Sequence, residues 1–385
     1  MALSITQTPA TASLAQSPIV FTLSESTDVI YSSSFQYNAD LYYWDGTPSA
    51  SGSSKYTLVK YPNNSGVGIF DVGRIINSTL TDLAQTNPSN VKFFRIDGYY
   101  QYNNGTTIVT SSKVASQTYK ALDGYALFQE PIGQQLFNKS NFYPLLTDGP
   151  ATQSYFSTNN GTSGVFVGAD GASTPTSLEY TGDLGSGTFL LSSSVNTAGQ
   201  IQQYPIGPTE TGFPLSANTS YFTIQAKSGS VNFGSPIRYE LQCEQKYPNI
   251  RIKWKNRYGQ FDWFNFNMIN RQSFQTERRT YQPQLGSFDA PTLSYNNYDS
   301  ATLNYISDST QTISVNTFFV SEDYNEIFKQ LLVSDEIYWI YDETNDDLRP
   351  ITILTDSVVF KTGVNDKLIQ YAFDFNWGQS YKLII

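Results

Sequence analysis

The chain contains no histidine, and its single cysteine is Cys243. The missing histidine excludes Ser-His-Asp and Cys-His catalysis, histidine metal ligands and the commonest general base near neutral pH. One cysteine can form neither an internal disulfide nor a cysteine-based zinc site. The stability of this protein must therefore come from packing and assembly, without covalent cross-links.

Charge is also scarce in this sequence. Charged residues make up 15% of the chain, where a soluble domain usually has about 25%, and the net charge is -10. Nucleic-acid binders are usually basic, so this balance argues against a nucleic-acid partner. No apolar run reaches the roughly 18 residues that a membrane helix needs, so we expect no membrane insertion. Residues 1–9 carry neither a basic region nor a long apolar run, so we expect no secretory signal.

Aromatic residues, in contrast, are abundant. The 385 residues include 28 Tyr, 25 Phe and 5 Trp, and much of the remainder is Ser, Thr, Asn, Gln and Gly. This composition favours strands over helices, because aromatic side chains pack well on a pleated surface. The length corresponds to two or three domains at roughly 100–200 residues each.

The N-terminal third predicts a sandwich of strands. Residues 35–43 alternate between apolar and polar side chains, which is the period of a half-buried strand. Residues 91–102 predict a strand that turns at Asn103-Asn104-Gly105 and returns as a hairpin. A strand at 19–23 and one helix over 72–83, capped by Asp71, accompany them. We therefore expect an immunoglobulin-like or fibronectin-like sandwich over residues 1–125.

The middle of the chain predicts a second domain. Residues 126–150 contain three prolines and predict a connector. Residues 151–245 are rich in Gly, Ser and Thr and predict a second small β-sandwich with long surface loops. Its candidate strands are 165–167, 188–191, 221–224 and 237–243.

The C-terminal part, residues 246–385, predicts a β-hairpin followed by a small α+β unit. Apolar residues at helical spacing indicate a helix over 321–333, which Ser321 can cap. The hairpin is expected over 246–266, and the later strands at 337–341, 351–360 and 368–375. The predicted fold class is mainly β: tandem immunoglobulin-like β-sandwich domains with a small α+β C-terminal unit.

The most distinctive segment is the aromatic hairpin at residues 254–266. Aromatic residues and arginine are enriched at the cores of protein interfaces, which makes this segment a candidate contact surface. The alternative is a hairpin buried in the core, with Arg257 paired to Asp262, and each face of the hairpin could serve one role. With two arginines further along the chain, the candidate interface residues are Trp254, Arg257, Tyr258, Phe261, Trp263, Phe264, Arg278 and Arg279.

Residues 246–279 form a basic region within an acidic chain. They include eight basic and two acidic residues, a net charge of +6. Such a region can complement an acidic surface on another copy and so fix register and orientation. A solvated strand face and a nucleic-acid contact are the alternatives.

The acidic residues give no clear catalytic or metal site. Residues 342–347 gather carboxylates in a predicted hairpin loop whose oxygen atoms could bind Ca²⁺. The EF-hand pattern fails there, and a solvated turn explains the loop as well. Nothing in the sequence sets two acids opposite each other as a glycosidase requires. We therefore predict no enzyme activity, no cofactor and no metal.

Three parts of the chain together carry a family resemblance. They are the opening Ser17–Phe21 with Phe35–Trp44, the aromatic segment Arg251–Phe266 with Arg271, Thr276–Tyr281 and Leu285-Gly286 after it, and the ending Lys367–Phe375. These segments resemble structural proteins of tailed phages of Bacteroidota-type hosts, including crAss-like and related marine phages. The likeness leaves residues 110–245 uncovered. It implies a virion protein of the tail, neck or baseplate type and assigns no functional residue beyond the motif.

Composition favours the same class. Few Lys and Glu with many Ser, Thr, Asn and Tyr are typical of proteins built for the extracellular environment. A chain of this type without a signal, made in the host cytoplasm, is typical of virus particles. We expect a non-enzymatic structural component of a tailed-phage virion, with copies of itself and other virion proteins as partners.

Two alternative functions remain open at this stage. One is a receptor-binding or glycan-binding tail protein, which would contact a host surface glycan through loops at 157–177 and 195–220, near Tyr204 and Tyr221. The other is a surface adhesin, against which the missing signal argues.

Overall fold

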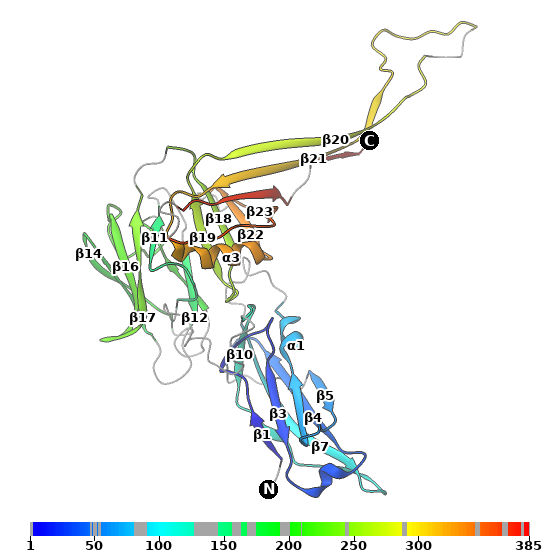
Figure 1. Cartoon of the computed structure of the whole chain (residues 1–385), viewed down its shortest axis with the longest axis vertical. Coiled ribbons are helices and arrows are strands. Elements are labelled where there is room, and N and C mark those ends of the chain that lie inside the picture. Colours follow the sequence, from blue (N-terminus) through cyan, green and yellow to red (C-terminus); the bar gives the residue numbers. More distant parts are fainter. Residues whose placement is uncertain are drawn as a thin grey trace. The chain divides into compact units, whose positions relative to one another are not determined.

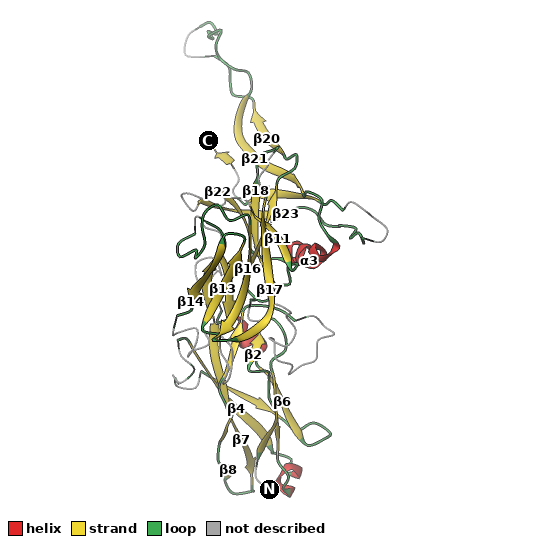
Figure 2. Ribbon diagram, turned by 90° about the vertical axis from the view of Figure 1, so that its left-hand side faces the viewer, coloured by secondary structure: helices red, strands yellow, loops and turns green. Residues whose placement is uncertain are grey.

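The computed structural model describes most of the chain as strands joined by loops (Figure 1, Figure 2). The mainly β class is confirmed, while the immunoglobulin-like type of the domains stays a prediction. Among the described residues, no helix is long and apolar enough to cross a membrane. The described residues are 3–46, 48, 52, 55–80, 91–126, 145–155, 163–167, 175–192, 201–208, 210–242, 246–286, 291–342, 347–363, 369–378 and 381–384.

The chain divides into two compact units, each made of segments that are distant in sequence. The first unit comprises Met1–Cys243, Trp254–Asp262 and Glu326–Asp335, and the second comprises Glu244–Lys253, Trp263–Asn325 and Glu336–Ile385. The division into parts at 125, 150 and 245 that the sequence suggests stays a prediction.

The first unit begins with two sheets. The smaller has the strand order β1-β3-β6, and the larger has the order β2-β10-β7-β4-β5, with β8 and β9 also paired to β7. The elements are β1 Ser4–Gln7, β2 Ala12–Leu14, β3 Val20–Ser24, η1 Asp28–Tyr31, β4 Gln36–Trp44, β5 Tyr56–Lys60, β6 Val67–Asp71, α1 Gly73–Asn77, β7 Val91–Asn103, β8 Ile108–Thr110, β9 Val114–Ala115 and β10 Tyr119–Leu122.

These two sheets share one buried core, which gives this part its β-sandwich character. Phe21 of β3 and Phe70 of β6 lie in the same cluster as Tyr37 of β4, Phe94 of β7 and Tyr119 of β10. The ring of Phe21 meets those of Phe94 and Tyr119 edge-on, with centroids 6.3 and 5.5 Å apart. Edge-to-face pairs add to the stabilisation that burial provides. The predicted strands behind this core and the hairpin from β7 to β8 are confirmed.

Strand β4 differs from its prediction in one respect. The alternating pattern predicts a strand with one solvated face, but both faces are buried along most of β4. Asp40 accepts a hydrogen bond from the Thr57 hydroxyl at 2.7 Å and pairs with Lys113 at 2.5 Å. These two partners compensate the cost of burying the Asp40 carboxylate. The polar face of β4 can therefore be buried as well.

Helix α1 is shorter than the helix predicted from the sequence. The N-cap position of α1 is Val72 and not the predicted Asp71, and no side chain makes a capping hydrogen bond there. The Asp71 carboxylate, one residue earlier, accepts a hydrogen bond from the N–H of Gly73, the first helical residue, at 3.0 Å. The hydroxyls of Ser78 and Thr79 each donate to a backbone carbonyl three residues back, both at 2.7 Å. Such bonds compete with the helical pattern and help to end the helix here. The last part of the predicted helix, from residue 81 on, lies outside the described residues.

The middle of the chain adds two more sheets to the first unit. One has the order β11-β17-β16-β13-β14, and in the other β12 pairs with β15. The predicted strands overlap β12, β14, β16 and β17. The loops at 156–162 and 168–174, Cys243 and residues 127–144 of the predicted connector lie outside the described residues. The bounds are β11 Thr152–Tyr155, β12 Ser163–Val167, β13 Ser177–Gly182, β14 Gly185–Leu190, β15 Ile201–Pro205, β16 Tyr221–Ser228 and β17 Val231–Leu241.

The last sheet has the strand order β19-β18-β22-β23-β24-β21-β20, with β25 also paired to β21. The hairpin predicted over 246–266 is confirmed, because β18 and β19 are neighbours in this order. The elements are β18 Ile250–Lys255, β19 Phe261–Phe266, β20 Arg271–Tyr281, β21 Leu303–Asn316, η3 Glu322–Tyr324, α3 Asn325–Val333, β22 Ile337–Asp342, β23 Asp347–Ile353, β24 Ala372–Trp377 and β25 Tyr381–Ile384.

The helix predicted over 321–333 is confirmed as the turn η3 followed by α3, in which Ile327, Phe328 and Leu331 are buried. The prediction of its cap is wrong. Ser321 lies at the capping position, but its side chain makes no capping hydrogen bond and its hydroxyl is 3.3 Å from the Asp323 carboxylate.

The strand predicted over 351–360 ends early, since β23 stops at Ile353. The backbone N–H of Leu354 still donates to the Asp374 carbonyl at 2.8 Å. One residue later, the Thr355 hydroxyl accepts the Asp374 N–H at 2.8 Å. The side chain thus takes the place of the backbone carbonyl in the ladder, and the regular pairing ends there.

The sandwich core gives a first testable prediction. Phe94 is fully buried between the two sheets, so Phe94→Ala removes a large side chain and leaves a cavity. We expect the free energy of unfolding to fall by about 3–5 kcal/mol, measured by urea denaturation. The matched control is Ile108→Ala on β8, which is 72% exposed and should cost less than about 0.5 kcal/mol. Similar losses for both variants would contradict the assignment of this core.

Candidate functional site

Strands β20 and β21 form a long hairpin ribbon at the edge of the last sheet (Figure 1), and β21 also pairs with β24 and β25 on its other side. All of β20 is exposed except Thr276, which is half-buried. Residues 303–308 of β21 are exposed or half-buried, whereas Ser309, Ile313 and Val315 are buried. We call residues 271–316 the arm. The sequence did not predict it, because exposed strands need no alternation of apolar and polar residues.

The arm carries an unusual number of exposed apolar side chains. Strands β24 and β25 support β21 by pairing with it, whereas β20 pairs with β21 alone among the described strands. Exposed apolar clusters of this kind mark interaction sites in soluble proteins. The exposed large apolar residues of the arm are Phe274, Tyr281, Leu285, Leu293, Tyr295, Tyr298, Leu303 and Tyr305.

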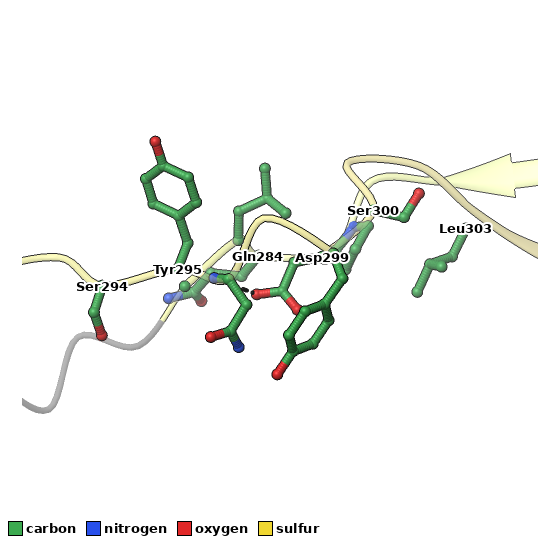
Figure 3. Close-up of a pocket in the computed structure, with 11 residues that line it drawn as sticks. Gln284, Ser294, Tyr295, Asp299, Ser300 and Leu303 are labelled. Atoms are coloured by element: carbon green, nitrogen blue, oxygen red, sulfur yellow. Dashed lines mark hydrogen bonds between the residues drawn. The ribbon is translucent and has the colours of Figure 1, made fainter.

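The far end of the arm encloses a hollow of about 590 Å³. It is lined by Leu285, Tyr295, Tyr298 and Asp299 among others, and the ring of Tyr295 stands away from the chain trace (Figure 3). The Asp299 carboxylate accepts the Asn296 N–H at 3.1 Å and so fixes the turn at this end. Apolar rings and hydrogen-bonding groups therefore lie side by side at the end of the arm.

Two of the predicted interface residues, Arg278 and Arg279, lie on the arm, and both are exposed. Arg271, at the start of β20, is exposed as well. Glu277 stands opposite Asp308 of β21, so the ribbon also carries acidic groups. Arginine and aromatic side chains, both of which are enriched at interfaces, are thus exposed along the arm.

The other predicted interface residues belong to the hairpin, and most of them are buried. Trp254 and Tyr258 have no exposed surface, and Phe264 is 4% exposed. Phe261 and Trp263 are half-buried. The fully buried rings support the fold and offer no surface to a partner, so the structure favours the core interpretation for them. The Trp263 ring instead receives the Arg251 guanidinium, at 4.6 Å from its centroid.

A half-buried carboxylate, Asp148, holds the turn of this hairpin in the first unit. It accepts hydrogen bonds from Arg257 Nε at 2.5 Å and from the Tyr258 hydroxyl at 2.6 Å. Gln330 of α3 adds a third bond at 2.9 Å and accepts the Arg257 N–H at 3.0 Å. The sequence suggests Asp262 as the partner of Arg257, whereas the structure gives this arginine Asp148. Three distant segments therefore meet at one charge.

Asn256 fixes the shape of the same turn. Its side-chain oxygen accepts the N–H groups of Tyr258 and Gln260 at 3.0 and 3.1 Å. Its amide nitrogen donates to the Leu146 carbonyl at 2.8 Å and to the Asp262 carboxylate at 3.2 Å. Both polar atoms of the Asn256 side chain have hydrogen-bond partners. This buried side chain therefore orders the turn without the cost of an unsatisfied polar group.

Burial and neighbouring charges shift three ionisable groups of this turn. Burial raises the pKa of Asp262 to about 7, although hydrogen bonds from Thr147 and Asn256 oppose that shift. Burial and then the charge of Asp148 raise the pKa of Tyr258, which keeps its hydroxyl protonated as a donor. Burial works to lower the pKa of Lys255, but Asp123 at 3.0 Å and Asp335 at 3.1 Å outweigh it and raise the pKa.

The remaining predicted sites are placed as follows. Among the residues that the structure describes, no three acidic or cysteine side chains are grouped to hold a metal ion. Residues 343–346 of the acidic loop lie outside that part of the chain. Tyr204, expected near a surface loop, is buried, and Tyr221 is half-buried beneath the Arg238 guanidinium, 3.9 Å from its ring centroid. These tyrosines are therefore poorly placed for a glycan.

A comparison with protein-family models finds no model that matches this chain, and a comparison with curated proteins finds no relative.

The hairpin turn gives a second prediction. Gly259 has a φ of +73°, and a Cβ there would lie 2.2 Å from the Asp123 carbonyl oxygen. We expect Gly259→Ala to reduce the free energy of unfolding by more than about 3 kcal/mol in a denaturation experiment. Gly46→Ala is the control, since Gly46 has a φ of +95° but open space around it and should cost about 1 kcal/mol. Equal losses would show that the close approach has no energetic weight.

The raised pKa of Asp262 gives a third prediction. In the unfolded chain this carboxyl has a pKa near 3.8, so between about pH 4 and pH 7 only the folded state retains the proton. Its stabilising contribution is full below that window and is lost as pH rises through 7. Compared with Asp262→Asn, wild-type stability should therefore fall by roughly 1–3 kcal/mol across this range. Asp356→Asn, on an exposed segment, should follow the wild-type curve. Parallel curves for wild type and Asp262→Asn would rule out the shift.

Proposed function

We propose that this chain is a non-enzymatic structural component of a tailed-phage virion, of the tail, neck or baseplate type, and that it assembles through its arm. The observation that carries the proposal is the exposed surface of the arm, whose described residues include eight large exposed apolar side chains. Exposed apolar clusters of this kind mark interaction sites, so the arm is suited to docking onto a neighbour.

The driving force for such docking is burial of the apolar surface of the arm. Each Å² of apolar surface removed from water contributes about 25 cal/mol. Tyr295 and Tyr298, 67% and 85% exposed, hold the largest unused area at the far end. Aromatic anchors of this kind dominate the binding energy of many interfaces, and the arginines of β20 would set orientation.

The inner end of the arm supports the same proposal indirectly, because Ile313 and Val315 of β21 are buried within the second unit. A docking part works best on a rigid base, because less entropy is lost on binding. The single cysteine allows no internal disulfide, which fits a protein that is stabilised by packing and assembly. The sequence resemblance to phage structural proteins points to the virion as the place of assembly.

A second candidate is a glycan-binding tail protein, and the hollow at the end of the arm favours it. Exposed tyrosine rings beside Asp299, Gln284 and Ser300 could stack against sugar rings and bond to their hydroxyls. Of the two loops that the sequence suggests for this role, 157–177 lies largely outside the described residues, whereas most of 195–220 is described and Tyr204 within it is buried.

The test compares particles that carry variants of the exposed tyrosines. We expect the double variant Tyr295→Ser, Tyr298→Ser to fold normally but to be incorporated into phage particles at least tenfold less, measured by quantitative mass spectrometry of purified virions. The matched control is Tyr31→Ser, which removes a ring that is 80% exposed on the first unit.

Normal incorporation of the double variant into phage particles would count against an assembly role for the arm. Normal incorporation with loss of adsorption to host cells would favour the glycan-binding role, and a glycan array with the purified chain would then identify the sugar.

A further inference from the structure

Strand β20 is the last strand of its sheet, and none of the described strands pairs with its outer edge. The strand is regular over all 11 residues and contains neither proline nor glycine. The one irregularity in the ribbon lies on the other strand, where Tyr305 of β21 is left out of the register. Proteins usually protect such edges with bulges, prolines or charges, and β20 has only the charges.

We propose that β20 of one copy pairs antiparallel with β20 of a second copy, about a two-fold axis beside Thr276. The pairing extends the sheet across two molecules and satisfies the backbone groups of both outer edges. A two-fold axis requires a self-complementary surface, so the sequence of β20 must match its own reverse. This inference rests on the proposed role of the arm in assembly.

The side chains of β20 meet that requirement when Thr276 is the centre. On one face, Phe274 of each copy then lies opposite Arg278 of the other. On the other face, Arg271 lies opposite Tyr281. Each of these pairs sets a guanidinium beside an aromatic ring, which is a favourable cross-strand contact. All 11 residues overlap, and no two like charges stand directly opposite.

Neighbouring registers are less favourable. Moving the centre by one residue sets Arg271 against Arg279 in one direction and Glu277 against its own copy in the other. Like charges directly opposite each other destabilise a strand pair. A centre at Phe274 sets Arg271 opposite Glu277, which is favourable, but it overlaps only residues 271–277 of the strand and forms fewer backbone hydrogen bonds. The register centred on Thr276 therefore combines full overlap of the two strands with favourable side-chain pairs and no like charges directly opposite each other.

The two ends of the arm also match in this arrangement. Antiparallel pairing brings the far end of each arm to the base of the other. The base exposes Ile269 and Phe319, 47% and 52% accessible, and the Asn316 side chain bonds to the Ile269 carbonyl at 2.7 Å. The far end exposes Leu285 and Tyr298. Apolar surface therefore faces apolar surface at both ends of the paired strands.

The test uses disulfide formation across the two-fold axis. In a Cys243→Ser background, Thr276→Cys places the two new thiols on residues whose Cα atoms are about 4.5–5.5 Å apart, within the range of a disulfide. We expect mild oxidation to give a covalent dimer of the full chain on a non-reducing gel, and light scattering to give a dimer before oxidation.

The matched control is Gln272→Cys in the same background. Its two copies would lie far apart along the paired strands, so it should give at least tenfold less dimer. Mixed with a Thr280→Cys chain, it should form the mixed dimer, because residues 272 and 280 stand opposite each other. A monomer in light scattering, equal cross-linking at 272 and 276, or cross-linking of Phe274→Cys in place of Thr276→Cys would overturn the proposal.

These results can be separated from those on particle incorporation. A chain that enters virions through its exposed tyrosines but never cross-links at residue 276 overturns the strand pairing alone. A chain that cross-links at residue 276 but is absent from virions supports the pairing and overturns the proposed function.

Discussion

The carboxylate of Asp148 is the interaction on which the first unit depends. It receives Arg257 and Tyr258 from the hairpin and Gln330 from α3, so that three segments far apart in the chain meet at one half-buried charge. The guanidinium of Arg257 is buried, and it is tolerated there because this carboxylate compensates its charge. The hydrogen bonds to Asp148 therefore form together only in one arrangement of the three segments. The close approach of Gly259 to Asp123 leaves no room for another arrangement.

Aromatic residues have two different roles in this molecule. Within the sandwich and the hairpin they fill cores, as Phe21 and Trp254 do. On the arm the same residue types face solvent, where they cannot stabilise the isolated chain. That contrast is the basis on which we propose an assembly role for the arm. The charges of β20 add the means to select a register.

The parts of the fold that depend on hydrophobic pattern were predictable from the sequence. The strands at 19–23 and 91–102 and the helix beginning at Ser321 alternate or repeat clearly, and the structure contains them. The arm was not predictable, because strands exposed on both faces lack a periodic apolar pattern. Nor was the partner of Arg257, since the sequence does not reveal that Asp148, more than a hundred residues away, neutralises it. The periodic pattern also does not show where a side chain replaces a backbone hydrogen-bond acceptor, as the Thr355 hydroxyl does at the end of β23.

The path of the chain through its two units has a consequence for modularity. The polypeptide crosses from one unit to the other five times. No single cut separates the units, and neither can be produced from one uninterrupted stretch of gene. A single recombination crossover with another gene would replace part of each unit. The new part and the remaining part of each unit would never have been selected to pack together. This protein is therefore expected to be inherited and to diverge as one piece, whereas proteins with consecutive domains can exchange them as cassettes.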